Sequence, residues 1–306
     1  MKNGTKKETS TMPMRQDLTD IEKLEIPAID TSYTFTDIFT EVALDIKENK
    51  KVLLTGHMGT GKSSLFMQIA ARCNQPVKRV NLNGQTTISD LVGFWTVKGG
   101  ETVWVEGALP KAMQRGYWLI LDELDFAEPQ IMSVINAVAE ENGALFLKEK
   151  GGDEVVLPHK YFRLLATANT VGIMEEFRHL YQGANIMNRA LLDRFRVYKV
   201  DYLPPVKEVK VLMSKVPDLP EPVATNLVNF ANDLREAFNN ENISCTFSLR
   251  QLIDFTQLII RKADYKKDLS TQECIFEAAN VSIYSKMSRE DGEVVKGILQ
   301  RTLRTS

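Results

Sequence analysis

The stretch GHMGTGKSS, residues 56–64, decides the fold of this chain. It satisfies the pattern G-x-x-x-x-G-K-[ST], and it lies between an apolar run at residues 52–54 and an amphipathic stretch at residues 63–72. A strand, a glycine loop and a helix start together aim a ring of backbone N–H groups at phosphate oxygens. A chance glycine turn is the alternative. We predict a phosphate-binding loop made of Gly56, His57, Met58, Gly59, Thr60, Gly61, Lys62, Ser63 and Ser64.

A second stretch, YWLILDE at residues 117–123, predicts a buried strand that ends in two carboxylates. Asp122 would hold a metal ion through its water shell, and Glu123 would polarise an attacking water. Lys62 would place its charge at the β- and γ-phosphates, and the Ser63 hydroxyl would ligate Mg²⁺. We therefore predict ATP and Mg²⁺ as cofactors, Ser63 and Asp122 as metal ligands, and Glu123 as a catalytic residue. GTP is disfavoured, because the sequence contains no N-K-x-D motif.

The composition is that of a soluble globular protein, with 43% hydrophobic and 25% charged residues and a formal net charge of −2. Such a balance supplies no global field for binding nucleic acid or an anionic membrane. No apolar stretch approaches the ~18 residues that a membrane span needs. Cys73, Cys245 and Cys274 are far apart, which favours a reducing compartment and argues against a structural zinc site. We predict a cytoplasmic protein without membrane insertion.

Short apolar runs alternate with helical stretches between residues 51 and 200. This alternation predicts an α/β fold, a parallel sheet with helices on both faces. After Leu203-Pro204-Pro205 only helical periodicity remains. We predict a mobile N-terminal tail at residues 1–25, a nucleotide-binding α/β domain at 26–203 and a small all-helical lid domain at 204–306. The expected strands cover residues 52–55, 77–81, 117–121, 163–168 and 196–200.

Two predicted hairpins, at residues 94–105 and 144–157, interrupt the α/β pattern. Both exceed what a simple crossover needs, so we expect insertions that carry function. Trp95 and Trp104 of the first hairpin would contact a partner or pack on their own domain.

Three polar side chains beyond the loop are candidates for catalysis. Asn169 closes the strand at 163–168, whose tip we expect beside Asp122, so its amide would orient the hydrolytic water; a plain turn residue is the alternative. Arg194 lies at the sheet edge away from its own loop, and we hypothesise that it completes a neighbouring subunit's site rather than forming a surface ion pair. Arg250 begins a lid helix and would sense the γ-phosphate, unless it is an ordinary exposed residue.

Together these residues resemble an AAA+ ATPase of the MoxR branch, and within it the ATPase subunits of cobaltochelatases. The likeness covers about residues 26–215. It is most specific in ARCNQPVKRVNLNGQTTISDLVG, LILDELDFAEPQIMSVI and PHKYFRLLATANTVG. Asn169 matches the family's sensor 1, and Arg194 matches its arginine finger better than Arg189 does. The Ser248-x-Arg250 series is similar to the sensor 2 motif S-P-R but has Leu249 in place of proline. Asp125 matches an acidic position, and either positions the loop after the catalytic pair or caps the next helix.

The resemblance implies a Mg²⁺-dependent ATP-hydrolysing ring, a hexamer, that remodels a partner protein. That partner would carry a von Willebrand A-type domain or be a set of chelatase subunits. A nucleic-acid-handling motor is the first alternative, and the acidic charge balance disfavours it. A nucleotide-gated scaffold is the second, and the set of Glu123, Asn169 and Arg194 argues against it.

Overall fold

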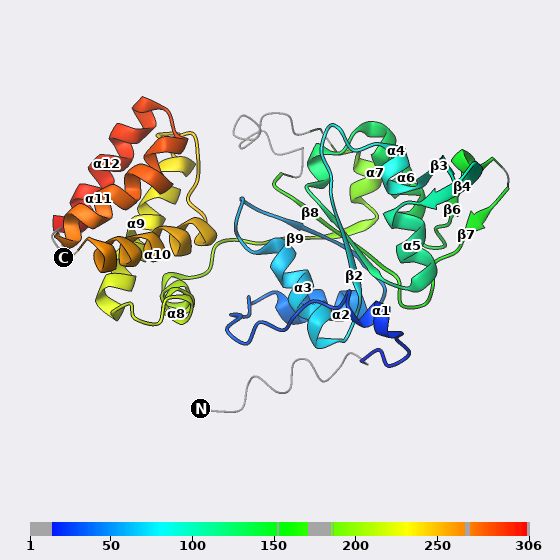
Figure 1. The fold of residues 1–306 in the computed structure, drawn as a ribbon, viewed down its shortest axis with the longest axis horizontal. Helices are drawn as coiled ribbons and strands as arrows, with labels where there is room; N and C mark the ends of the chain where they lie inside the picture. Colours follow the sequence, from blue (N-terminus) through cyan, green and yellow to red (C-terminus); the bar gives the residue numbers. More distant parts are fainter. Residues whose placement is uncertain (1–13, 152, 171–184, 186, 267–269, 305–306) are drawn as a thin grey trace. The chain divides into compact units, whose positions relative to one another are not determined.

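The computed structural model describes residues 14–151, 153–170, 185, 187–266 and 270–304. The chain divides into two compact units (Figure 1). The first contains the chain up to Asp30, Phe35–Gly56 and Gly61–Val200. The second contains Thr31–Thr34, His57–Thr60 and the chain from Asp201 onward.

The first unit is built on a parallel sheet with the strand order β2-β5-β8-β1-β9 among the described residues. The predicted parallel α/β fold is therefore confirmed. The central strands form because their apolar runs are buried on both faces, as parallel sheets require. The strand bounds are Lys51–Thr55 for β1, Val77–Asn81 for β2, Trp118–Asp122 for β5, Arg163–Ala168 for β8 and Phe195–Lys199 for β9.

Parallel pairing brings three strand ends to one edge of the sheet. Strand β8 lies between its two partners, with Leu121 of β5 opposite Ala166 and Thr55 of β1 opposite Ala168. The residues that follow β1, β5 and β8 therefore emerge side by side. These are the segments in which the sequence places the phosphate loop, Glu123 and Asn169.

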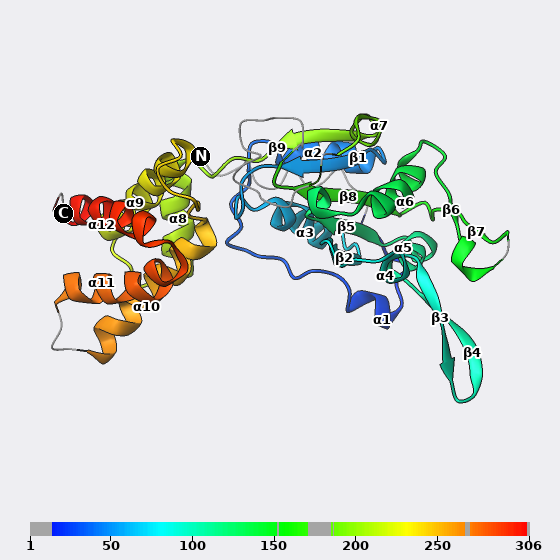
Figure 2. The ribbon, with the colours of Figure 1, turned by 90° about the horizontal axis from the view of Figure 1, so that it is seen from above.

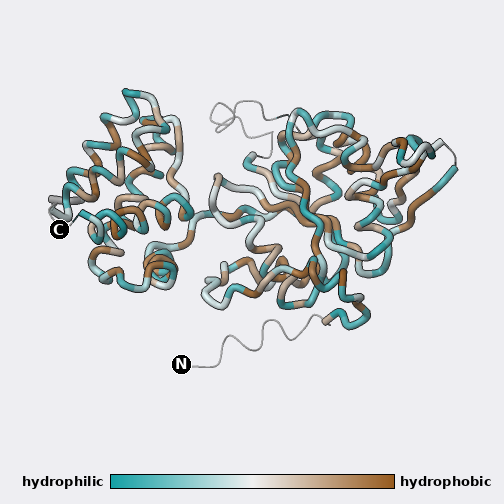
Figure 3. The backbone as a smooth tube through the Cα atoms, in the orientation of Figure 1, coloured by the Kyte–Doolittle hydropathy of each residue, from teal (hydrophilic) through white to brown (hydrophobic). Residues whose placement is uncertain are grey.

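Helices cover both faces of the sheet. Figure 1 shows α2 and α3 on one side of the strands, and α5 and α6 on the other. The interior is apolar, and Figure 3 shows the hydrophobic stretches concentrated in the strands and the inward parts of the helices. The helix bounds are α2 Phe39–Lys47, α3 Lys62–Arg72, α4 Ile88–Leu91, α5 Ala108–Arg115, α6 Pro129–Ala139 and α7 Arg189–Leu192, with a 3-10 turn η1 at Leu124–Phe126.

The N-terminal segment is held to the first unit from Arg15 onward. Arg15 is 4% exposed, and its guanidinium donates to the Gly116 carbonyl at 2.9 Å. Its backbone N–H donates to the Cys73 carbonyl at 3.2 Å, and helix α1 (Asp20–Lys23) begins with a capping box on Thr19. Hydrogen bonds from Arg15 thus connect this segment to the rest of the first unit, and the mobility of residues 1–25 stays a prediction. Residues 1–13 of the predicted tail lie outside the described residues.

The first predicted hairpin is present, formed by β3 (Gly93–Lys98) and β4 (Glu101–Glu106). Gly99 and Gly100 both have positive φ, as a tight hairpin turn requires. Trp95 and Trp104 face each other across the strands with ring centroids 5.5 Å apart. Figure 2 shows this hairpin extending away from the sheet of the first unit.

The second hairpin is shorter than predicted. Strands β6 (Leu145–Phe146) and β7 (Val155–Val156) contribute two residues each. A 3-10 turn, η2 at Lys148–Lys150, takes up part of the connection, so its residues cannot join the ladder.

The described part of the second unit is helical. Its helices are α8 Pro205–Lys215, α9 Glu221–Asn239, α10 Leu249–Tyr265, α11 Thr271–Ser282 and α12 Arg289–Arg304, with a 3-10 turn η4 at Tyr284–Lys286. The predicted helical periodicity after the Pro pair is confirmed. Helix α11 ends at Ser282 and is followed by that 3-10 turn. In the described chain, no helix has the combination of length and apolar character that crossing a bilayer demands.

One buried ion pair links two helices of the second unit. The Arg235 guanidinium donates to Glu208 at 2.7 Å, and both side chains are at most 6% exposed. Arg235 also donates to the Phe247 carbonyl at 2.8 Å, and its guanidinium lies 3.9 Å from the Tyr202 ring centroid. The pair therefore ties α8 and α9 to the loop before α10.

We expect Glu208→Ala to destabilise the second unit by about 3–5 kcal/mol, because it leaves a buried guanidinium without its counter-charge. The matched control is Glu221→Ala, an exposed residue in the first turn of α9, for which a loss below about 1 kcal/mol is expected. Denaturant unfolding followed by circular dichroism measures both. Equal losses in the two variants would show that the buried pair has no special role.

Candidate active site

The loop between β1 and α3 has the backbone of a phosphate cradle. Its glycines all have positive φ, 144° at Gly56, 77° at Gly59 and 91° at Gly61. Side chains other than glycine adopt these angles only at a cost. Gly61 is also the N-cap of α3, so the first N–H groups of that helix remain available for an anion.

The middle of the loop, His57–Thr60, is grouped with the second unit. Within it, the Thr60 hydroxyl donates to the His57 carbonyl at 3.0 Å and closes a tight turn. The parts that His57, Met58, Gly59 and Thr60 play in binding stay predictions. Ser64 is exposed in the first turn of α3.

Lys62 is buried at the start of α3 and bridges two strand ends. Its ammonium donates to the Gly56 carbonyl at 2.6 Å and to the Asn169 amide oxygen at 3.1 Å. Burial lowers the pKa of Lys62 to about 8, although the carboxylates of Asp125, Asp122 and Glu123 favour its charged form. Its cation is therefore weakly hydrated and ready to take a phosphate in place of these partners.

Asp122 is buried and fully engaged. Its Oδ1 accepts from the Ser63 hydroxyl at 2.5 Å and from the Thr167 hydroxyl at 2.8 Å. Its Oδ2 accepts from the Arg79 guanidinium of the neighbouring strand β2. The two predicted metal ligands, Ser63 and Asp122, are thus in direct contact. Two oxygen donors beside a phosphate loop are the chemistry that Mg²⁺ prefers, so the residues present fit this ion.

Glu123 has an unusual backbone. It adopts the left-handed conformation with φ 59° and ψ 47°, which costs about 1–2 kcal/mol for a residue with a Cβ. Its N–H donates to the Thr167 hydroxyl at 3.4 Å. Outliers of this kind persist where the surroundings fix them, and they cluster at functional sites. Strand β5 ends at Asp122, so Glu123 lies outside the ladder at the start of η1.

Asn169 follows β8, and β8 pairs with β5 as expected. Its side-chain amide oxygen accepts a hydrogen bond from the Lys62 ammonium. The Asn169 backbone N–H donates to the buried Asp125 carboxylate at 3.0 Å. The structure thus brings Lys62, Ser63, Asp122, Glu123 and Asn169 together at one edge of the sheet.

Arg194 lies elsewhere. It precedes Phe195, the first residue of β9, which pairs with Lys51 at the start of β1, whereas the phosphate loop follows Thr55. Four residues of strand separate these points, roughly 13 Å. The Arg194 guanidinium donates to Glu140 at 3.0 Å and to the Ala190 carbonyl. It is therefore not part of its own chain's site.

Arg250 and Arg189 are not brought to this site by any described contact. Arg250 is exposed in the first turn of α10, which starts with a capping box between Ser248 and Gln251. It belongs to the second unit, so its role as a sensor stays a prediction. Arg189 is exposed at the start of α7.

Two residues that contact Asp122 were not predicted from the sequence. The sequence does give a clue for Thr167, because a hydroxyl inside the apolar run of β8 requires a hydrogen-bond partner. Arg79 gave no local signal, since its contact depends on which strand neighbours β5.

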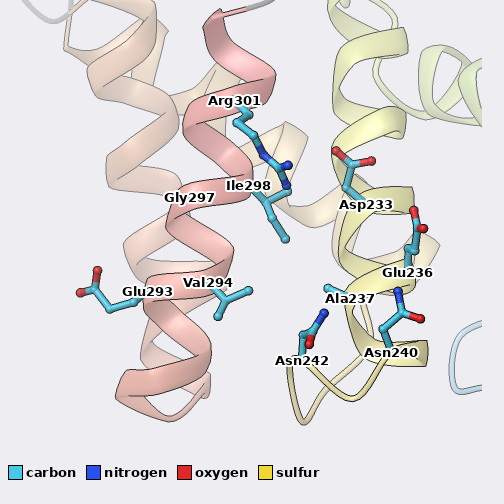
Figure 4. A pocket seen from close by; sticks show the side chains of 10 residues that line it. All are labelled: Asp233, Glu236, Ala237, Asn240, Asn242, Glu293, Val294, Gly297, Ile298 and Arg301. Atoms are coloured by element: carbon cyan, nitrogen blue, oxygen red, sulfur yellow. The ribbon is translucent and has the colours of Figure 1, made fainter.

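A pocket of about 590 Å³ lies in the second unit, between α9 and α12. Figure 4 shows Asp233 and Glu236 on one wall, and Glu293 and Arg301 on the other. None of the predicted site residues lines it. Its mixed charges and open form identify no ligand.

Comparison with known proteins places both units. Residues 51–195 match the family model of the AAA domain, dynein-related subfamily, and residues 208–302 match that of the CbbQ/NirQ/NorQ C-terminal region. Aerobic cobaltochelatase subunit CobS from a Sinorhizobium species is 37% identical over 76% of this chain and 72% of its own length.

Two longer relatives match over part of their length. Midasin from Dictyostelium discoideum is 30% identical over 69% of this chain, which corresponds to 4% of midasin. Mouse von Willebrand factor A domain-containing protein 8 is 28% identical over 77% of this chain and 13% of its own length.

We expect the affinity for ATP to depend on the Lys62 ammonium. Because its pKa is lowered to about 8, affinity should be full below that pH and fall about tenfold per pH unit above it. Calorimetric titration from pH 7.5 to 9.5 measures the effect. Lys62→Arg is the control: its guanidinium stays charged, so weaker binding without a break near pH 8 is expected. An unchanged affinity up to pH 9.5 in the unsubstituted protein would contradict the assignment.

Proposed function

We propose that this chain, which belongs to the AAA family of ATPases with a CbbQ/NirQ/NorQ-type C-terminal region, is a Mg²⁺-dependent ring motor that remodels or activates a partner protein. The observation that carries the proposal is the meeting of Lys62, Ser63, Asp122, Glu123 and Asn169 at one sheet edge. These side chains supply a phosphate-binding cation, oxygen donors for a metal, a base and an amide.

Each of these residues has a role in hydrolysis. The Lys62 ammonium binds the β- and γ-phosphate oxygens, exchanging its present partners for them. Ser63 and Asp122 would hold Mg²⁺, which neutralises charge on the phosphates when bound. Glu123 accepts the proton of the attacking water, and the Asn169 amide orients that water or touches the γ-phosphate. Thr167 fixes the Asp122 carboxylate.

The place of Arg194 supports a ring. Arg194 lies at the opposite ends of the strands from the phosphate loop, so it is placed to serve a site other than its own. Its ion pair with Glu140 is partly exposed, so it is worth about 0–1 kcal/mol and can be exchanged. In a ring Arg194 would stabilise the charge on a neighbour's γ-phosphate. Six subunits are the number that the family resemblance implies.

Mixing two inactive variants tests the shared site. Arg194→Ala should bind ATP but lose hydrolysis, on the order of 10³-fold. Lys62→Ala should not bind ATP, yet it still carries Arg194. In a mixture, the intact loop of the first variant meets the intact arginine of the second, so part of the ATPase activity should return. Activity that stays absent in every mixing ratio would argue against a shared site.

The kind of partner is suggested by the relatives. One of them is by name a subunit of a cobaltochelatase, and another contains a von Willebrand factor A domain in the same chain as the similar segment. We therefore expect a partner with a von Willebrand A-type domain, or a set of chelatase subunits. A cytoplasmic location accords with free thiols at Cys73, Cys245 and Cys274.

A trapped variant identifies the partner. Glu123→Gln should bind ATP and hydrolyse it ~10²–10⁴-fold more slowly, which is the scale of losing a general base. Immobilised with ATP, it should retain a von Willebrand A-type protein or chelatase subunits, and release them with ADP. Lys62→Ala is the control that should retain neither. Retention of the same proteins by both variants, or of nucleic acid instead, would contradict a role in ATP-dependent protein remodelling.

A further inference from the structure

Asp125 is a buried acid that the proposed chemistry does not use. It lies in η1, two positions beyond Glu123, and its side chain is 0% exposed. Burial raises the pKa of its carboxyl group, against several hydrogen bonds that lower it. Its Oδ1 has no hydrogen-bond partner among the described residues. Burying a carboxyl group costs free energy, so we expect its hydrogen bonds to serve a structural or functional purpose.

Several hydrogen bonds of Asp125 reach residues that follow β8 in the chain. Its Oδ2 accepts from the backbone N–H groups of Asn169 at 3.0 Å and Thr170 at 3.1 Å, and from the Thr170 hydroxyl at 3.3 Å. Its backbone carbonyl accepts from the Asn185 N–H at 2.6 Å. Asp125 does not cap α6, because that helix has Glu128 as its N-cap and no side-chain cap bond. The alternative left open by the sequence is thereby decided.

These contacts fix the Asn169 amide. Strand β8 ends at Ala168, so the ladder no longer holds the backbone of Asn169. The Asp125 carboxylate takes over this task by accepting from the backbone N–H groups of Asn169 and Thr170. The Asn169 amide oxygen then accepts from Lys62 at 3.1 Å, which completes a chain of hydrogen bonds from Asp125 through Asn169 to the phosphate loop.

We propose that Asp125 is a positioning residue for ATP hydrolysis, which holds the Asn169 amide in place beside Lys62 and Glu123. The inference rests on the proposed role of Asn169. Lys62 keeps its bond to the Gly56 carbonyl without Asp125, although it loses a nearby carboxylate that favours its charged form. We therefore expect nucleotide binding to depend on Asp125 less than turnover does. A displacement of about 1 Å in a catalytic group costs roughly 10² in rate.

Two substitutions of Asp125 distinguish a positioning role in catalysis from a purely structural role. In Asp125→Ala the Oδ2 atom that accepts from both N–H groups is lost, and kcat should fall roughly 10²-fold while KM for ATP changes less than about threefold. In Asp125→Asn one acceptor oxygen of the same shape remains, and kcat should stay within about fivefold of the unsubstituted protein. The control is Glu128→Ala, an exposed residue three positions further on at the N-cap of α6, which should leave both constants unchanged.

The double variant Asp125→Ala, Asn169→Ala tests whether Asp125 affects kcat through Asn169. Since both residues act through one amide, kcat should fall no further than in Asn169→Ala alone. Additive losses, a parallel rise of KM, equal kcat in the Ala and Asn variants, or an Asp125→Ala protein that does not fold would each overturn the inference. If Asn169→Ala itself leaves kcat unchanged, the role proposed for Asn169 fails first, and the two failures are thereby distinguished.

Discussion

The parallel pairing of β8 between β1 and β5 is the constraint on which the site depends. It makes three chain segments leave the sheet at the same edge, although they are far apart in the sequence. The Lys62 ammonium joins two of these exits, and the Asp122 carboxylate joins β5 to both of its neighbours through Arg79 and Thr167. The residues that we propose for phosphate binding, metal binding and water activation therefore all lie at one edge of one sheet.

The same edge concentrates charge that the fold has to accommodate. A buried lysine lies close to three carboxylates, and its ammonium is kept by their attraction against the cost of desolvation. Glu123 adds a left-handed backbone, and Asp125 adds an oxygen that has no hydrogen-bond partner among the described residues. Sites of this kind lower the stability of the folded protein, because the catalytic arrangement requires strain and buried charge. ATP and a metal ion offset this cost only when they are bound.

Local patterns predict the strands and the loop well, because apolar runs bounded by Gly or Asp are short and distinct. The bounds of β2 and β8 agree with the expected ranges, and the glycine angles follow from the motif. What depends on tertiary neighbours was not predictable. The Arg79 contact requires β2 beside β5, and the anchoring of Arg15 uses a carbonyl about a hundred positions away. From the sequence alone, Asp125 fits a helix cap as well as a loop-positioning role, because only the structure shows that the end of β8 lies beside it.

Calorimetric titration of the whole chain with a non-hydrolysable ATP analogue, with and without Mg²⁺, tests the central claim most directly. If β1, β5 and β8 bring one phosphate and metal site together, one analogue molecule should bind per chain, and Mg²⁺ should strengthen its binding. Substitution of Asp122 by Asn should remove the effect of Mg²⁺ and leave metal-free binding largely intact. No heat of binding, or binding that is indifferent to Mg²⁺ and to Asp122, would contradict the account.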